Sequence, residues 1–163
     1  MIPVYLQDDV KERLESLFNG QLFESPDSVK VPLKVYSQHL PIIDSNDEDE
    51  EPDELSLYPY ILIKLQEGTQ ESWTSPLVTS VDLVIGVFNE DKERKGYQDV
   101  VSILQKIQAD FLSKPHMDNQ FSLVSPPNWM LHDEDLHPFY FGGVELRFEQ
   151  GININRKDVN HLL

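Results

Sequence analysis

Four side chains between residues 132 and 137 are the clearest candidates for chemistry in this chain: His132, Asp133, Asp135 and His137. Imidazoles and carboxylates act as metal ligands and as general bases. Four residues separate the two histidines, so a helix would not place them on one face as the HExxH spacing does. Because Pro138 follows, we expect a surface turn here. A metal-dependent enzyme using His132 and His137 stays open as an alternative.

A second candidate is a calcium loop that begins at Asp44. Asp44, Asn46 and Glu48 have the first spacings of such a loop. Asp49 stands where the loop needs glycine, and Leu55 stands where it needs a bidentate glutamate. We therefore expect a solvated acidic loop, with weak and nonspecific binding of divalent cations as the alternative.

Other kinds of catalytic site find no support in the sequence. The chain has no cysteine, which excludes thiol nucleophiles, disulfides and Cys-ligated zinc. It has neither a G-x-S-x-G nucleophile motif nor a glycine-rich phosphate loop. We expect a protein that is not an enzyme and that needs no cofactor or metal.

The charge of the chain is strongly acidic and unevenly spread. The formal net charge is -16, and residues 44–54 contribute eight carboxylates without a base. This balance disfavours specific binding to nucleic acid or to anionic membranes, because no basic excess neutralises phosphates. Like charges at this density repel, so we expect a mobile acidic loop at 44–54.

Hydrophobic periodicity predicts an α+β fold. Val10, Leu14 and Phe18 mark a helix that starts near Asp9, and a second helix is expected over 97–112. Strands are expected at 33–37, 60–65, 81–88, 121–124 and 144–149. We predict an antiparallel or mixed sheet of about four to six strands with two main helices packed on one face.

The length of 163 residues suggests one domain over 1–150, followed by a tail over 151–163. Several aromatic residues exceed what the predicted core needs. Because aromatic residues are enriched at interface centres, they are candidate protein-interface residues: Trp73, Trp129, Phe139 and Tyr140.

Three segments together resemble the tail terminator proteins of long-tailed bacteriophages, which are also called tail completion or head–tail joining proteins. The first is the apolar strand Val81–Phe88, which ends in a turn. The second is Gly96-Tyr97-Gln98-Asp99, which leads into a helix. The third is the closing strand 141–148, led by Phe141-Gly142-Gly143. The acidic segment 44–54 and the chain after Glu149 have no counterpart in this pattern.

The resemblance implies a structural protein of the virion tail or neck, assembled in the host cytoplasm. It implies a homo-oligomeric ring, a hexamer, that caps the tail-tube protein and joins it to the head connector or stopper protein. DNA would pass through without specific binding, and the protein would not contact a membrane. A negative lumen would repel phosphates, which makes the acidic loop a candidate channel lining: Asp47, Glu48, Asp49, Glu50 and Glu51.

Two further functions remain open. An acidic inhibitor or DNA mimic would use the carboxylates to bind a basic partner, in a salt-sensitive manner. Another neck or baseplate assembly protein of a phage would share most features of a tail terminator.

Overall fold

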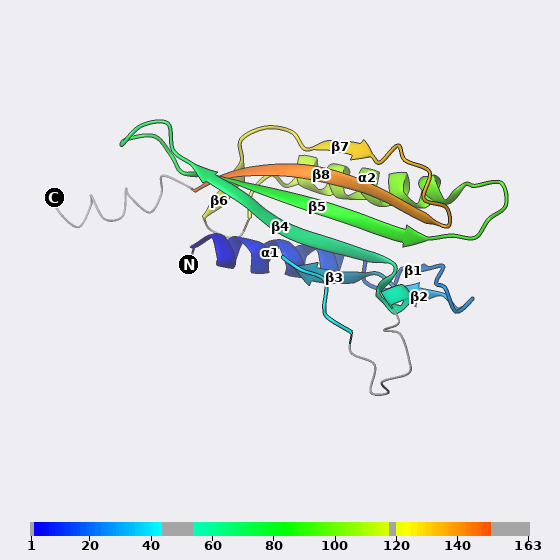
Figure 1. Ribbon diagram of the computed structural model, residues 1–163. Coiled ribbons are helices and arrows are strands. Elements are labelled where there is room, and N and C mark those ends of the chain that lie inside the picture. Colours follow the sequence, from blue (N-terminus) through cyan, green and yellow to red (C-terminus); the bar gives the residue numbers. More distant parts are fainter. Residues whose placement is uncertain (1, 44–53, 118–119, 151–163) are drawn as a thin grey trace.

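The computed structural model describes residues 2–43, 54–117 and 120–150. Its elements are shown in Figure 1 and follow in chain order: α1 (Ile2–Leu17), β1 (Leu22–Phe23), β2 (Val31–Pro32), β3 (Lys34–Ser37), the 3-10 helix η1 (Glu54–Leu57), β4 (Tyr60–Thr69), β5 (Val78–Phe88), α2 (Gly96–Ser113), β6 (Phe121–Leu123), β7 (Asn128–Leu131) and β8 (Phe139–Gln150).

A six-stranded mixed sheet forms the centre of the fold. Its order is β3-β4-β5-β8-β6, and β7 also pairs with β8. Only β3 and β4 run parallel; the other pairs in this sheet are antiparallel. β1 and β2 form a separate antiparallel pair. The predicted α+β fold with a mixed sheet is confirmed.

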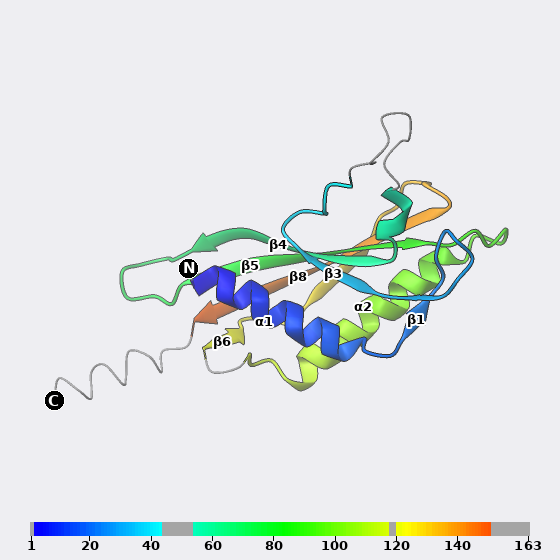
Figure 2. The ribbon, with the colours of Figure 1, turned by 90° about the horizontal axis from the view of Figure 1, so that it is seen from below.

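Both long helices cover the same face of this sheet, as predicted. Figure 2 shows α1 and α2 on the same side of the strands, where they meet at an angle. Alternate strand residues point into this layer and are fully buried, among them Ile61, Leu83 and Leu146. Leu14 of α1 and Leu104 of α2 belong to the same core cluster. The alternate residues of the strands and the periodic apolar residues of the helices therefore pack into one continuous core.

The predicted start of the first helix is wrong. Asp9 lies inside α1, which begins at Ile2. The added turns are held by tertiary contacts, because Leu6 is fully buried and the Gln7 amide donates to the Ile63 carbonyl oxygen at 2.9 Å. Asp9 favours a helix start, but the burial of the preceding turn outweighs this preference.

Two parts of the predicted organisation fall beyond what the structure describes. Residues 44–53 of the acidic loop and the tail 151–163 lie outside the described residues. Glu54, the last residue of the predicted loop, begins η1. Among the described helices, none is long and apolar enough to cross a membrane.

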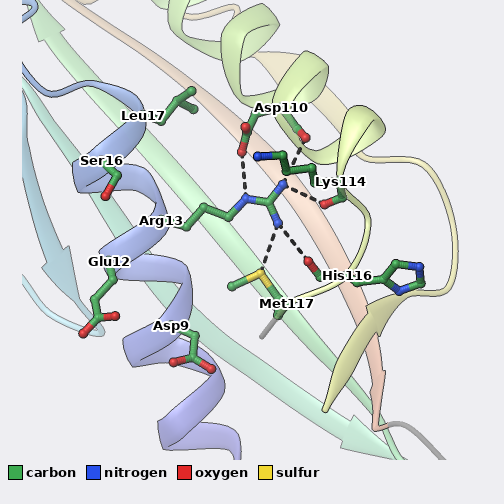
Figure 3. Close-up of a pocket in the computed structure, with 9 residues that line it drawn as sticks. All are labelled: Asp9, Glu12, Arg13, Ser16, Leu17, Asp110, Lys114, His116 and Met117. Carbon is green, nitrogen blue, oxygen red and sulfur yellow. Dashed lines mark hydrogen bonds and ion pairs between the residues drawn. The ribbon is translucent and has the colours of Figure 1, made fainter. Parts of the chain in front are cut away.

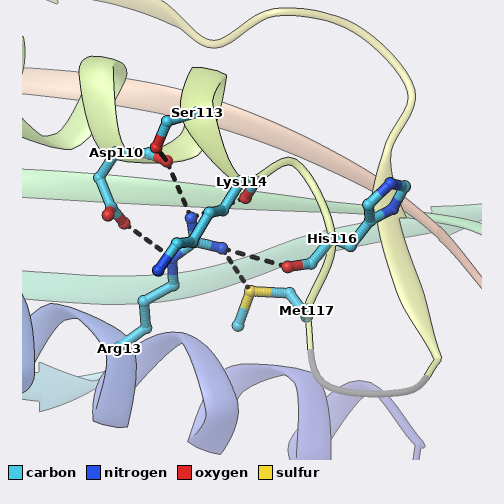
Figure 4. Close-up of polar contacts among 6 residues, drawn as sticks. All are labelled: Arg13, Asp110, Ser113, Lys114, His116 and Met117. Carbon is cyan, nitrogen blue, oxygen red and sulfur yellow. Dashed lines mark hydrogen bonds and ion pairs between the residues drawn. The ribbon is translucent and has the colours of Figure 1, made fainter.

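Arg13 joins α1 to the end of α2 (Figures 3 and 4). Its Nε donates to the Asp110 carboxylate at 2.7 Å. One terminal nitrogen donates to the carbonyl oxygens of Asp110 and Lys114, at 3.0 and 2.7 Å, and the guanidinium lies 4.0 Å from the centre of the Phe111 ring. The last carbonyls of a helix lack partners within it, and Arg13 adds a charged donor there. The Asp110 carbonyl also accepts from the Lys114 N–H and the Ser113 hydroxyl.

We expect Arg13→Ala to lower the free energy of unfolding by about 2 kcal/mol, because it removes charge-assisted bonds from half-buried acceptors. Arg13→Lys should recover only part of the loss, since an ammonium group lacks the planar fork. Lys92→Ala, at an exposed turn position, should change stability by less than about 0.5 kcal/mol. Urea denaturation measures all three, and equal stability of Arg13→Ala and wild type would refute the role of this contact.

Candidate protein interaction surface

The face of the sheet opposite the two helices, which we call the open face, is apolar at one end. Strand register aligns one row of residues across β3, β4, β5, β8 and β7 on this face: Tyr36, Leu62, Val84, Gly143 and Met130. Leu62 is 8% exposed, whereas Met130 is 71% exposed. The row therefore runs from a covered end at β3 and β4 to an uncovered end at β7.

The same end of the open face carries an aromatic cluster, which we define as Tyr58, Tyr60, Phe88, Phe139 and Phe141. The Tyr58 ring centre lies 5.1 Å from that of Tyr60 and 4.9 Å from that of Phe139. The Tyr60 ring lies over Gly86 of β5, where a Cβ atom would come within 2.6 Å of it. Glycine at position 86 therefore lets this ring pack directly against the β5 backbone.

The phenol groups in this region have weakened acidity. Burial, followed by the effect of Tyr58, raises the pKa of Tyr60 above its ordinary value. Burial also raises the pKa of Tyr36. Both hydroxyl groups therefore stay neutral at physiological pH, which suits packing and hydrogen bonding rather than proton abstraction.

A shallow hollow lies where β5, β8 and β7 meet. Its lining is Val84, Met130, Leu131, His132, Asp133, Phe141, Gly142 and Gly143. Gly143 contributes no side chain to the floor, and the neighbouring Gly142 faces the helices, where a Cβ would lie 2.6 Å from Val100. The two adjacent glycines thus act on opposite faces of β8. Gly142 allows α2 to pack closely, and Gly143 leaves room for the hollow on the open face.

The open face becomes charged two positions further along β8. Asp82 of β5 is directly opposite Glu145 of β8, and Lys64 of β4 is opposite Asp82 on its other side. Partial burial, followed by repulsion from Glu145, raises the pKa of Asp82. A hydrogen bond with Gln66 and the charge of Lys64 oppose the shift, each less strongly than Glu145 promotes it. The two carboxylates therefore form an unfavourable cross-strand pair.

The His/Asp cluster at residues 132–137 forms a turn whose side chains contact different partners. His132 pairs with Glu134 at 3.6 Å, and His137 Nδ1 lies 2.7 Å from the Tyr140 hydroxyl. Asp135 pairs with Arg94. Over residues 2–43, 54–117 and 120–150, no group of three or more His, Asp or Glu side chains could hold a metal ion.

The predicted interface residues occupy different places. Trp73 lies on the β4–β5 hairpin with its side chain 99% exposed, and Trp129 on β7 is 38% exposed. Phe139 packs into the aromatic cluster. Tyr140 packs against Gly96 at the start of α2. The candidate channel residues Asp47, Glu48, Asp49, Glu50 and Glu51 lie outside the described residues.

Sequence reasoning did not single out Tyr58 or Met130, which complete the open face. Tyr58 follows η1 in a segment with no period of its own, and Met130 lies on β7, a strand that was not predicted. The alternation over 81–88 puts Val84 and Phe88 on the opposite face of the strand from Leu83. That alternation was the available signal for an apolar second face.

We expect Asp82→Asn to stabilise the protein at neutral pH and to have little effect near pH 3. A raised carboxyl pKa means that the folded state binds the proton more tightly than the unfolded chain does. Protonated Asp82 therefore stabilises the folded state below the ordinary carboxyl pKa of the unfolded chain. This stabilisation is lost as pH rises through the raised pKa of the folded state. Urea denaturation of variant and wild type at both pH values measures the difference. A variant equally stabilised at both would show that the cause is not ionisation. Glu71→Gln, in the exposed hairpin, is the matched control.

Comparison with family models and with curated proteins finds no match to this chain. Function is therefore inferred from the residues and from the geometry described above. The open face, the hairpin that carries Trp73 and the helix-covered core are its physical basis.

Proposed function

We propose that this protein is a structural virion-assembly protein of the tail terminator type. It would cap the end of a phage tail tube as a ring and join the tube to the head connector. The family resemblance of residues 81–148 motivates the proposal. The observation that supports it most directly is a sheet with one face buried by helices and the other left partly apolar among the described residues.

Two exposed features suit contacts between proteins. Trp73 is 99% exposed on a hairpin that projects beyond the helices at one end of the sheet (Figure 1). Met130 and the hollow lie elsewhere on the open face, on β7, β8 and β5. The hairpin would contact a different surface of the neighbouring subunit, and such a head-to-tail interface forms a ring when its rotation closes. The hollow would then stay available to another protein of the assembly.

The net charge of -16 sets the conditions for assembly. Acidic subunits repel one another, and the repulsion weakens when a partner surface or divalent cations neutralise part of the charge. A ring of such subunits would also repel the phosphates of DNA passing through it. Assembly would therefore depend on ionic conditions and on the tube end.

We expect light scattering across protein concentration to show a ring-sized species that magnesium promotes. The physical reason is reduced repulsion between acidic subunits. Magnesium and sodium should be compared at equal ionic strength, so that specific neutralisation is separated from screening. A strict monomer in every condition would contradict self-assembly of the free protein and would favour the acidic-inhibitor function.

We expect Trp73→Ala to reduce the oligomer fraction while leaving the melting temperature of the monomer within about 2 °C of wild type. A side chain 99% exposed contributes almost nothing to the core. Leu112→Ala, at a position on α2 that is 55% exposed, is the matched control and should leave the oligomer unchanged. An unchanged oligomer in Trp73→Ala would remove the hairpin from the proposed interface.

A second candidate function is an acidic inhibitor or DNA mimic, which the net charge favours. It predicts one-to-one binding to a basic protein that weakens steeply as salt rises. The terminator function predicts an assembly of many copies. The mass of the complex therefore separates the two functions.

A further inference from the structure

The hollow on the open face has a floor and walls but no cover among the described residues. Val84, Phe141 and Gly143 line it from the central strands, and Met130 borders it while 71% exposed. Exposing a methionine at this level forgoes the free energy that its burial would provide. Its flexible thioether also adapts readily to a partner's side chain.

Acidic groups stand on two sides of the hollow. On one side Asp133 contributes to the lining, and Glu134 follows with its side chain 72% exposed. On the other side lie Glu145, two positions along β8 from Gly143, and Asp82, which is opposite Glu145 on β5. Like charges placed directly opposite each other across two strands destabilise a sheet. Lys64 offsets part of this repulsion from the β4 side of Asp82, and a cationic group that a partner places beside Glu145 would relieve the rest.

The distances along β8 match the repeat of an α-helix. Two residues of a strand span about 7 Å, which is the step from the Gly143 row to the Glu145 row. Four residues of a helix rise about 6 Å. A helix lying along β8 could therefore place an apolar side chain in the hollow and a basic side chain, one turn later, beside Glu145.

We propose that the open face binds a basic amphipathic helix of a partner protein. One apolar side chain of the helix fills the hollow beside Met130, and a Lys or Arg one turn away pairs with Glu145 and Asp82. Helices are the usual cover for an apolar sheet face, and this protein already covers the opposite face with two of them.

Charge complementarity favours this occupant over a second copy of the chain. A second copy carries the same net charge of -16. The tip of its hairpin carries Glu71 near Trp73, and Glu67 lies at the adjoining end of β4. Its approach to Asp133 and Glu145 would therefore bring like charges together. The inference goes beyond the proposed ring, because it concerns a different protein and a different surface from the hairpin.

The experiment uses the full chain labelled with ¹³C at its methionine methyl groups. The probe is a synthetic Leu/Lys amphipathic helix, and the matched probe has Glu at every Lys position. We expect the Lys helix to give a saturable shift of the Met130 methyl resonance. Met117 serves as an internal control, because it is 6% exposed and contacts Arg13 on the helix-covered side. Its resonance should not move.

Variants then test the charged contact. Glu145→Gln and Asp82→Asn should each weaken binding of the Lys helix by about threefold at low salt. Glu12→Gln, which removes the same charge from the exposed side of α1, should leave binding unchanged. Met130→Gln should weaken binding further without unfolding the protein, because its side chain is exposed. Thermal melts of each variant check that the fold is intact.

Four results would overturn the proposal. They are an unmoved Met130 methyl group, equal shifts with the Lys and Glu helices, an equivalent shift caused by magnesium alone, and a shift that appears with protein concentration in the absence of peptide. The last would identify a second copy as the occupant. Ring formation is read from the mass of the protein and helix binding from the Met130 resonance, so either can fail without the other.

Discussion

The pairing of β5 with β8 is the constraint on which the rest of the structure depends. All eleven residues of β5 are matched, from Val78 opposite Glu149 to Phe88 opposite Phe139. A slip of one residue would move every side chain to the other face. This register therefore decides at once which residues enter the core, which form the aromatic cluster, and which carboxylates oppose each other.

Close packing on the helix face keeps this register in place. Gly142 allows α2 to approach β8, since a Cβ there would lie 2.6 Å from Val100. Arg13 then ties the end of α2 to α1 through Asp110 and the carbonyl of Lys114. The helices are thus held against β8 and against each other. The residues of the open face take no part in these contacts with α1 and α2.

The sequence predicted the elements whose pattern is local and missed those that tertiary contacts create. Alternation over 81–88 and the helical period over 97–112 correspond to β5 and α2. β7 follows two prolines and exists through its pairing with β8. α1 extends back to Ile2 because Gln7 finds its partner on β4, 56 residues away. The candidate surface could be predicted only in part. Alternation groups Val84 and Phe88 on one face of their strand, whereas Met130 and Tyr58 reach the open face only through tertiary contacts.

An open apolar face and a strongly negative charge impose opposite demands on an acidic protein. The apolar side chains favour association with any surface that can cover them, while the net charge of -16 opposes association with further acidic surfaces. The two demands agree only for partners that bring positive charge together with apolar side chains. The cross-strand pair of Asp82 and Glu145 extends this selectivity to within about 7 Å of the hollow. Specificity then follows from rejection of like-charged partners as much as from attraction to the correct one.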